Sequence, residues 1–323
     1  QFTYSELLTI TNNFQEELGK GASGSVYAGR LSDGTLVAVK MLSLHSTQGR
    51  KQFRTEASLL TKVHHRNVVS IMGYCNESQH KALLYEKMAR GTVKENLSGM
   101  NWNSANILSW EERLGIACDA AQGLEYLHDG CFPRVIHRDV KTANILLTES
   151  LHAKISDFGI SRLMPSDGGA YMASELAGTP GYYQGRNELN VKGDVYSFGV
   201  VLLELITGKP PVHENTHILD WVRPMVERAE IEQIVDSRLN SDFDTNCASK
   251  AVKTAMACVE FDSVQRPLMR QIVAELRECL EMEIARVKAH EETDQNHSFA
   301  SGTSVYVTPG SSVGSPSASS TGS

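Results

Sequence analysis

The stretch VIHRDVKTANILL, residues 135–147, places four ionisable side chains between two apolar runs: His137, Arg138, Asp139 and Lys141. Burying a charge without a partner is costly, so such groups are seldom pressed against a core without a reason. Either these side chains satisfy one another, or the site uses them for chemistry.

A second polar group follows within the same part of the chain. Asp157 stands in SDFG, directly after the strand-like HAKI, and lies thirteen residues beyond Asn144. Carboxylate and amide oxygens of this kind suit Mg²⁺, which leaves room for substrate phosphates. A carboxylate that is not bound to metal can accept a hydroxyl proton. Each residue alone would more often cap a helix or support a turn, but the set together favours phosphate chemistry.

The segment GKGASG matches GxGxxG with Gly19, Gly21 and Gly24. In a dinucleotide-binding fold this pattern leads directly into a helix. Here SVYAGRLSDG follows, which predicts a strand and a turn instead. A glycine loop between two strands can fold over phosphates with its backbone N–H groups unobstructed. A plain glycine-containing hairpin is the alternative.

Lys40 ends the segment VAVK, two residues after Ala38, so both side chains point to the same face of a predicted strand. In the next predicted helix, Phe53, Glu56 and Leu60 share one face. Glu56 therefore lies in an apolar stripe, where a carboxylate needs a cation, and Lys40 is the available one. This pair could serve a phosphate site or be purely structural.

The elements that carry these residues are of two kinds. From Phe14 to about Tyr85, apolar residues mostly alternate, which predicts strands interrupted by one helix. From SWEERLGIACDAAQGLEYLHDG to about Arg286, helical periodicity dominates. After Ser298 the chain is rich in Ser, Thr, Gly and Pro and offers no core. The pattern predicts an α+β protein with a small β-rich lobe, a larger α-helical lobe and a disordered tail.

Composition excludes several classes of protein. The chain has 323 residues, is 41% hydrophobic and carries a formal charge of −7 with a pI near 5.9, which argues against nucleic-acid binding. The longest apolar run, VVLLELI, contains Glu204 and indicates a buried helix, not a membrane span. Gln1 begins no signal peptide, so we expect a piece or a processed form. The six cysteines show no metal spacing and are expected to be free thiols.

From Phe14 to about Leu280 the chain resembles the eukaryotic protein kinases. The motifs GKGASGSVY, VAVK, HRDVKTAN, DFG, GTPGY and DVYSFGVVLLELITGKPP occur in that family's order. The segments FTYSELLTITNNF, LLYEKM and VQRPLM are most similar to plant receptor-like kinases. This resemblance implies a bilobal protein kinase fold, with a flank (1–13), an N-lobe (14–85), a hinge (86–91), a C-lobe (92–286) and a disordered Ser/Thr/Gly-rich tail (287–323).

The resemblance also implies an ATP site. Lys40 would bind the α- and β-phosphates while paired with Glu56, and Tyr85 would be the gatekeeper at the back of the pocket. The remaining nucleotide contacts would come from the glycine flap, the adenine sandwich and the hinge: Gly19, Gly21, Gly24, Val26, Ala38, Leu146, Glu86 and Met88.

The catalytic roles follow from the same resemblance. Asp139 would accept the proton of the substrate hydroxyl, and Lys141 would neutralise the γ-phosphate. Asn144 and Asp157 would hold Mg²⁺. A lysine two residues after the aspartate is typical of serine/threonine kinases, so the implied activity is transfer of the ATP γ-phosphoryl group to protein hydroxyls.

Arg138 beside this aspartate adds positive charge, which a phosphate on the activation segment would neutralise. The segment from Gly159 to Thr179 offers five hydroxyls, and among them we favour Ser174 as the acceptor. Thr179 is expected instead to contact Asp139 and Lys141. The other candidates are Ser161, Ser166 and Tyr171.

The segment after GTPGY departs from the family pattern. GYYQGRNELNVKGDVYSFG lacks the Pro-Glu pair whose glutamate would bind Arg266, and it is about four residues short. An alternative function is therefore a nucleotide-binding, pseudokinase-like scaffold. Its substrate-positioning segment after Tyr183, which we call the ledge, would be impaired. For the ledge segment Tyr182–Asn190 we expect poor order.

Receptor-like kinases usually carry an extracellular domain and one membrane span. The expected location is therefore the cytoplasmic side of the plasma membrane in the full-length protein, with this fragment soluble and touching the membrane only through a span outside it. Protein substrates and co-receptor kinases are the expected partners.

Overall fold

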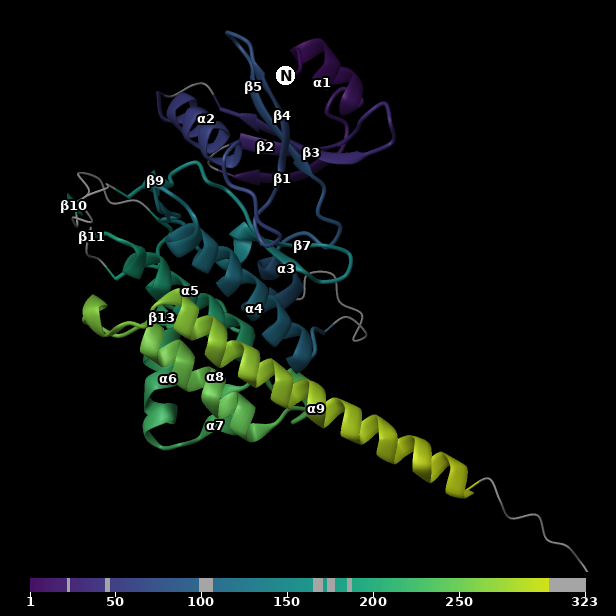
Figure 1. The fold of residues 1–323 in the computed structure, drawn as a ribbon, viewed down its shortest axis with the longest axis vertical. Helices are drawn as coiled ribbons and strands as arrows, with labels where there is room; N and C mark the ends of the chain where they lie inside the picture. Colours follow the sequence, from purple (N-terminus) through teal and green to yellow (C-terminus); the bar gives the residue numbers. More distant parts are fainter. Residues whose placement is uncertain are drawn as a thin grey trace, which may run out of the picture. The chain divides into compact units, whose positions relative to one another are not determined.

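A computed structural model describes residues 1–21, 24–43, 47–98, 107–164, 171–172, 178–184 and 188–301. Contacts divide the chain into two units, 1–284 and 285–323, and the two lobes that carry the site both lie within the first unit. The fold is the expected α+β arrangement, with a five-stranded antiparallel sheet in the N-lobe and a helical C-lobe (Figure 1).

The N-lobe sheet has the strand order β1-β2-β3-β5-β4. Its turn at Ser32–Gly34 joins β2 to β3, as the Ser-Asp-Gly-Thr signal predicts. The elements of this lobe are α1 (Tyr4–Ile10), β1 (Glu17–Gly21), β2 (Gly24–Arg30), β3 (Leu36–Leu42), α2 (Thr47–Leu60), β4 (Ile71–Asn76) and β5 (Lys81–Glu86).

Alternation along the strands assigns side chains to two faces of this sheet. Leu83 packs in the same cluster as Phe53 of α2, whereas Leu84, one residue later, packs in a separate cluster with Leu7 of α1. In Figure 1, α1 and α2 accordingly lie on opposite sides of the strands. The flank that precedes the glycine-rich strands is thus part of the N-lobe packing.

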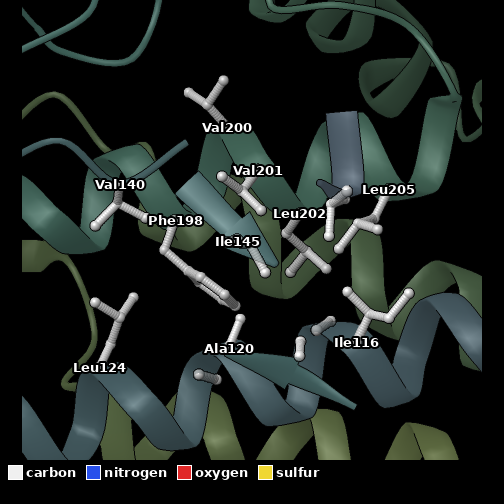
Figure 2. Close-up of a cluster of buried hydrophobic side chains, with 14 of the residues drawn as sticks. Ile116, Ala120, Leu124, Val140, Ile145, Phe198, Val200, Val201, Leu202 and Leu205 are labelled. Atoms are coloured by element: carbon white, nitrogen blue, oxygen red, sulfur yellow. The ribbon is translucent and has the colours of Figure 1, made fainter. Parts of the chain in front are cut away.

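The C-lobe is built around α4 (Trp110–Glu125) and α5 (Val191–Thr207). Ser109 caps α4 in a capping box with Glu112, and Gly208 ends α5 in the left-handed conformation. Figure 2 shows side chains of both helices gathered around Val140 and Ile145, which flank the polar stretch of residues 137–144. This apolar cluster supplies the rigid base beneath the site.

The other C-lobe helices are short, apart from α8 and α9. They are α3 (Val93–Ser98), η2 (Tyr126–Gly130), η3 (Thr142–Asn144), α6 (Ile218–Glu227), α7 (Ile231–Ile234), η4 (Ser237–Leu239), α8 (Thr245–Cys258), η5 (Ser263–Gln265) and α9 (Met269–Ser301). Helix α9 continues beyond residue 286, because Glu, Ala, Arg and Lys in EIARVKAHEE favour helix. Most of the tail expected to be disordered, residues 302–323, lies outside the described residues.

Two-residue and three-residue strands complete the C-lobe. They are β6 (Val135–Ile136), β7 (Ile145–Leu147), β8 (Ala153–Ile155), β9 (Arg162–Leu163), β10 (Tyr171–Met172), β11 (Glu188–Leu189), β12 (Val212–His213) and β13 (Thr216–His217). β7 pairs with β8, so Leu146 lies opposite Lys154.

All six cysteines are free thiols, as predicted. Over the ranges that the structure describes, no helix has both the length and the apolar character needed to cross a membrane.

Candidate active site

Lys40, Glu56 and Asp157 form a compact ion cluster between the lobes. Lys40 Nζ lies 2.9 Å from Glu56 Oε2 and 2.7 Å from Asp157 Oδ1. β3 presents Lys40 on its cleft face, α2 supplies Glu56 from its apolar stripe, and Asp157 follows β8. The pairing of Lys40 with Glu56 expected from the sequence is present, and Asp157 joins it across 117 residues of chain.

Burial and charge act in opposite directions in this cluster. Burial alone would lower the pKa of Lys40, but the carboxylates of Glu56 and Asp157 outweigh it and raise that pKa. For Asp157, burial would raise the pKa, whereas Lys40 lowers it below the ordinary value. Both partners are therefore charged at neutral pH. Glu56 Oε1 also accepts a hydrogen bond from Phe158 N at 3.2 Å, which fixes the carboxylate.

Asp139 and Lys141 form the second group, joined by Thr179. Lys141 Nζ lies 2.7 Å from Asp139 Oδ2 and donates to Thr179 Oγ1 at 2.8 Å. The Thr179 hydroxyl donates to Asp139 Oδ1 at 2.6 Å. Asn144 Nδ2 donates to Asp139 Oδ2 at 3.0 Å and to its carbonyl at 2.8 Å. The predicted contacts of Thr179 are confirmed, and a threonine 40 residues away completes the site.

Asp194 anchors the backbone of this polar loop from below. Its carboxylate accepts hydrogen bonds from His137 N at 2.7 Å and Arg138 N at 2.8 Å, and it lies 2.9 Å from His128 Nε2. These contacts hold Arg138 at a φ of 72°, a left-handed conformation that is strained for a residue that carries a Cβ. Asp157, which is bound by Lys40, has a φ of 64°. The loop is thus clamped in a conformation it would not adopt alone.

The glycines of the flap differ in what they require. At Gly24, with a φ of 138°, an added Cβ would lie 1.9 Å from the carbonyl oxygen of Met41, so only glycine fits. At Gly19 and Gly21 an added Cβ would meet no described atom within 4 Å. Packing therefore explains Gly24, whereas no packing contact requires glycine at Gly19 or Gly21.

The other nucleotide-site residues lie around the hinge. Val26 pairs with Lys40 and Ala38 with Tyr85 in the sheet register, while Leu146 bridges to Thr92 from the C-lobe. The hinge docks on β7 through a hydrogen bond from Leu147 N to the Gly91 carbonyl. The hinge residues Glu86 and Met88 are partly buried.

Tyr85 is buried, and its hydroxyl is the one buried side-chain oxygen or nitrogen in the described residues that lacks a hydrogen-bond partner. Burial raises the pKa of this phenol well above its ordinary value, so the group is neutral.

The donors available to a metal are an amide and a carboxylate. Asn144 uses its Nδ2 group on Asp139, which leaves its amide oxygen for a cation. The Asp157 carboxylate uses Oδ1 on Lys40 and its side chain is 30% exposed. No three His, Cys, Asp or Glu side chains of the described ranges form a self-contained metal site. These two donors fit Mg²⁺ that takes its other ligands from phosphate and water.

Two of the hydroxyls considered for phosphorylation can be assessed. Ser161 is fully buried and donates to the His137 carbonyl at 3.0 Å, so it is not an accessible acceptor. Thr179 is engaged by Asp139 and Lys141. Ser166 and Ser174 lie outside the described residues, as does the side chain of Tyr171.

The structure corrects the expectation for Arg266. Its guanidinium donates to the carbonyls of Glu260 at 2.8 Å and Lys192 at 2.9 Å and to Gln184 Oε1, and it lies 5.0 Å from the ring centroid of Tyr196. An amide and two carbonyls therefore bind an arginine that the sequence left without its carboxylate. Within the ledge, residues 185–187 and the side chain of Glu188 lie outside the described residues.

Three polar contacts were missed at the sequence level. They are the Asp194 anchor, the hydrogen bonds of Glu204 with Tyr182 and Thr142, and the ion pair of Glu86 with Lys154. The available signal was an acid within an apolar helix, which both Asp194 and Glu204 display in DVYSFGVVLLELI. Nothing local in the sequence indicates the third contact.

A two-lobed fold with this ion cluster and polar loop defines a class of protein. The family model described as protein tyrosine and serine/threonine kinase matches residues 12–276, and the chain belongs to that family.

Within this family, the chain is similar to receptor-like kinases of Arabidopsis thaliana. The chain is 52% identical over 299 residues to the probable LRR receptor-like serine/threonine-protein kinase At1g51880, covering 90% of this chain and 34% of the relative. It is 51% identical to the probable LRR receptor-like protein kinase At1g51890 (91% and 34%) and 48% identical to the LRR receptor-like serine/threonine-protein kinase IOS1 (92% and 34%). The chain thus spans about a third of the length of these relatives.

Proposed function

We propose that the chain is a serine/threonine protein kinase domain that transfers the γ-phosphoryl group of ATP to hydroxyls of protein substrates, its own included. The observation that carries the proposal is the group formed by Asp139, Lys141 and Thr179 beside the Lys40–Glu56–Asp157 cluster. A carboxylate, a cation and a hydroxyl lie within hydrogen-bond distance of one another, and a second cation lies across the cleft.

In the proposed reaction Asp139 receives the proton of the acceptor hydroxyl. Its carboxylate is largely buried but is held by Lys141, Thr179 and Asn144, so its orientation is set before the substrate arrives. Lys141 stabilises the negative charge of the transferred group, because its ammonium lies beside the proton acceptor.

For the nucleotide we propose that Lys40 binds the α- and β-phosphates while Glu56 holds its ammonium in place. Gly19, Gly21 and Gly24 would cover the phosphates with backbone N–H groups, and Tyr85 would close the back of the pocket. Val26, Ala38 and Leu146 would enclose the adenine, with backbone contacts from Glu86 and Met88.

Asn144 and Asp157 would hold Mg²⁺, which when bound screens the phosphate charge. Their roles in the chain are separate: Asn144 orients Asp139, and Asp157 also binds Lys40.

A nucleotide-binding scaffold without transfer is the alternative that the short ledge suggested. The contacts of Arg266 weaken that argument, because Gln184, Glu260 and Lys192 bind its guanidinium in this chain. The residues proposed for transfer also contact one another, since Lys141, Asn144 and Thr179 all bind the Asp139 carboxylate. These observations support the enzyme.

The test is an autophosphorylation assay of the purified chain with radiolabelled ATP, with and without excess EDTA. We expect Mg²⁺-dependent labelling on Ser or Thr, and loss of labelling in Asp139→Asn. Asp157→Asn should also abolish labelling while its melting temperature stays close to wild type. Mg²⁺-dependent ATP binding without labelling in the wild type would establish the scaffold instead.

The printed names of the relatives describe receptor-like kinases, so for the full-length protein we propose a place at the cytoplasmic side of the plasma membrane. Protein substrates and co-receptor kinases would be its partners. Co-precipitation of the full-length protein with a second receptor-like kinase, dependent on the segment outside this chain, would test this assignment.

A further inference from the structure

An ion pair joins the hinge to the C-lobe at the edge of the proposed nucleotide site. Glu86 is the last residue of β5 and Lys154 is the central residue of β8, 68 positions later. Lys154 Nζ lies 2.8 Å from Glu86 Oε1 and 2.9 Å from Glu86 Oε2. The ammonium therefore contacts both oxygens of the hinge carboxylate.

The carboxylate is fixed from the N-lobe side as well. Ser70 N donates to Glu86 Oε1 at 2.8 Å, and Glu86 N donates to the Ser70 carbonyl at 3.3 Å. Glu86 also pairs with Val37 in the sheet register. If Lys154 moves, the Glu86 side chain can move with it only if the end of β5, where the hinge begins, moves as well.

Lys154 is presented from an equally rigid base. Asn67 and Val69 bind the backbone of β8 on both sides of this lysine. Ile155 N donates to the Asn67 carbonyl at 2.9 Å, and Val69 N donates to the Ile155 carbonyl at 3.0 Å. On the other side, Asn67 Nδ2 donates to the Ala153 carbonyl at 3.0 Å. The Lys154 and Glu86 side chains are 16% and 31% exposed, so solvent screens the pair only in part.

We infer that Lys154 is a positioning residue for nucleotide binding: by holding both oxygens of Glu86, its ammonium fixes the hinge backbone against the C-lobe strand that carries the adenine-facing Leu146. Leu146 lies directly opposite Lys154 in the β7–β8 register, so one strand pair positions both the floor of the site and its hinge. The inference rests on the proposed nucleotide site. It assigns a residue that touches neither the nucleotide nor the transferred group.

The pair has physical reasons to matter for binding rather than for transfer. A bidentate, charge-assisted contact restricts two side chains to one geometry, and a pre-ordered hinge loses less freedom when the adenine binds. The transfer residues Asp139 and Lys141 have their own anchors in the C-lobe, Asn144 and Thr179. Loss of the pair should therefore weaken nucleotide binding and leave the transfer step nearly unchanged.

The experiment compares wild type, Lys154→Met, Lys154→Arg, Glu86→Gln and Lys87→Met. Lys87→Met is the matched control, because Lys87 is the next hinge residue and its ion pair with Glu16 is loose, at 3.8 Å. The readouts are the Kd of MgADP by calorimetry, KM for ATP and kcat separately, and the melting temperature without nucleotide.

We expect Lys154→Met and Glu86→Gln to raise the Kd of MgADP about tenfold, and Lys154→Met to keep kcat within about twofold of wild type. Lys154→Arg should restore binding to within about threefold, because its guanidinium keeps the positive charge and can donate to both oxygens of Glu86. Lys87→Met should bind like wild type. If Lys154→Met does not fold, Glu86→Gln decides by the same limit on the Kd, since its amide oxygen can still accept from Ser70 N.

The inference is overturned if both charge-removing variants bind MgADP like wild type, if Lys154→Arg binds as weakly as Lys154→Met, or if kcat falls while Kd is unchanged. A wild type that binds MgADP but transfers no phosphate would contradict the proposed kinase activity and would leave the binding comparison intact. A wild type that fails to bind MgADP contradicts both.

Discussion

At the scale of single residues, the Thr179 hydroxyl joins the two charges of the proposed transfer site. It donates to Asp139 Oδ1 and accepts from Lys141 Nζ, so it keeps the carboxylate turned and the ammonium within reach of it. Without this hydroxyl the two charged groups would contact only through Asp139 Oδ2.

Replacing Thr179 by valine should lower kcat by about ten- to a hundredfold, because misplacement of a proton acceptor is costly. KM for ATP should stay near wild type, since the nucleotide residues lie elsewhere. Thr179→Ser keeps the hydroxyl and should retain most of kcat. Steady-state kinetics on a protein substrate, with melting curves for all three proteins, would make the comparison. Equal kcat values for the valine and serine variants would show that the hydroxyl has no part in transfer.

At the scale of elements, Glu204 of α5 connects the polar loop to the segment after Thr179. Its carboxyl group lies 2.6 Å from Tyr182 Oη and 3.1 Å from Thr142 Oγ1, and it is 4% exposed. Burial raises the pKa of Glu204 to about 8, and the two hydroxyls counteract this only in part. At neutral pH the group is therefore mostly protonated and binds as a neutral carboxylic acid.

This raised pKa makes stability depend on pH. The unfolded chain releases the proton of Glu204 near its ordinary pKa of 4.5, whereas the folded chain keeps it up to about pH 8. The stabilisation is therefore complete below about pH 4.5 and is lost as the pH rises through 8, at about 1.4 kcal/mol per pH unit within that window.

Glu204→Gln should remove this component, because the amide does not titrate. Denaturant unfolding of wild type and variant at several pH values between 5 and 9 would measure the difference in free energy of unfolding. A difference that is constant across the whole range would rule out titration of Glu204.

The helix α1 is the second element with a testable role. Leu7 is fully buried in a cluster with Val37, Val39 and Leu84. The ring of Phe2 packs on Gly73 so closely that a Cβ added to Gly73 would lie 2.4 Å from the nearest ring carbon. A capping box of Thr3 and Glu6 starts the helix. The flank therefore shields one face of the N-lobe sheet.

Leu7→Ala should reduce the free energy of unfolding by about 2–5 kcal/mol, the usual cost of deleting a buried leucine. Ser5→Ala, on the exposed side of the same helix, is the control and should change it little. Urea denaturation followed by circular dichroism would give both values. An equal, small effect of the two substitutions would mean that α1 does not pack on the sheet in solution.

At the scale of the whole molecule, every residue placed in the site belongs to the unit of residues 1–284. The Ser/Thr/Gly-rich composition at the C-terminus gives no reason to expect a contribution to that unit.

A chain truncated after Glu292 should keep its transfer rate within about twofold of the full chain and its melting temperature within a few degrees. Parallel assays of the two proteins with the same protein substrate would test this. Loss of transfer by the shorter chain would assign a catalytic or stabilising role to the removed residues.

The sequence alone determined the fold class, the order of the elements and most of the candidate site. Lys40 and Glu56 could be paired because strand and helix periodicities place each on an inward face, and a buried carboxylate needs a cation. Asp139, Lys141 and Asn144 are close in the chain, so their meeting follows from local geometry. The glycine flap could be separated from a dinucleotide loop by the strand that follows it.

Only the tertiary structure decided which distant groups meet. Periodicity tells which face a side chain occupies, but not which side chain 68 or 117 residues away will face it, because that depends on how the lobes and strands pack. The Glu86–Lys154 pair, the approach of Asp157 to Lys40 and the burial of Ser161 are of this kind. Arg266 is the plainest case: the sequence lacks its expected glutamate, and the fold brings an amide and two carbonyls to it, because a buried guanidinium can donate to any well-placed oxygen.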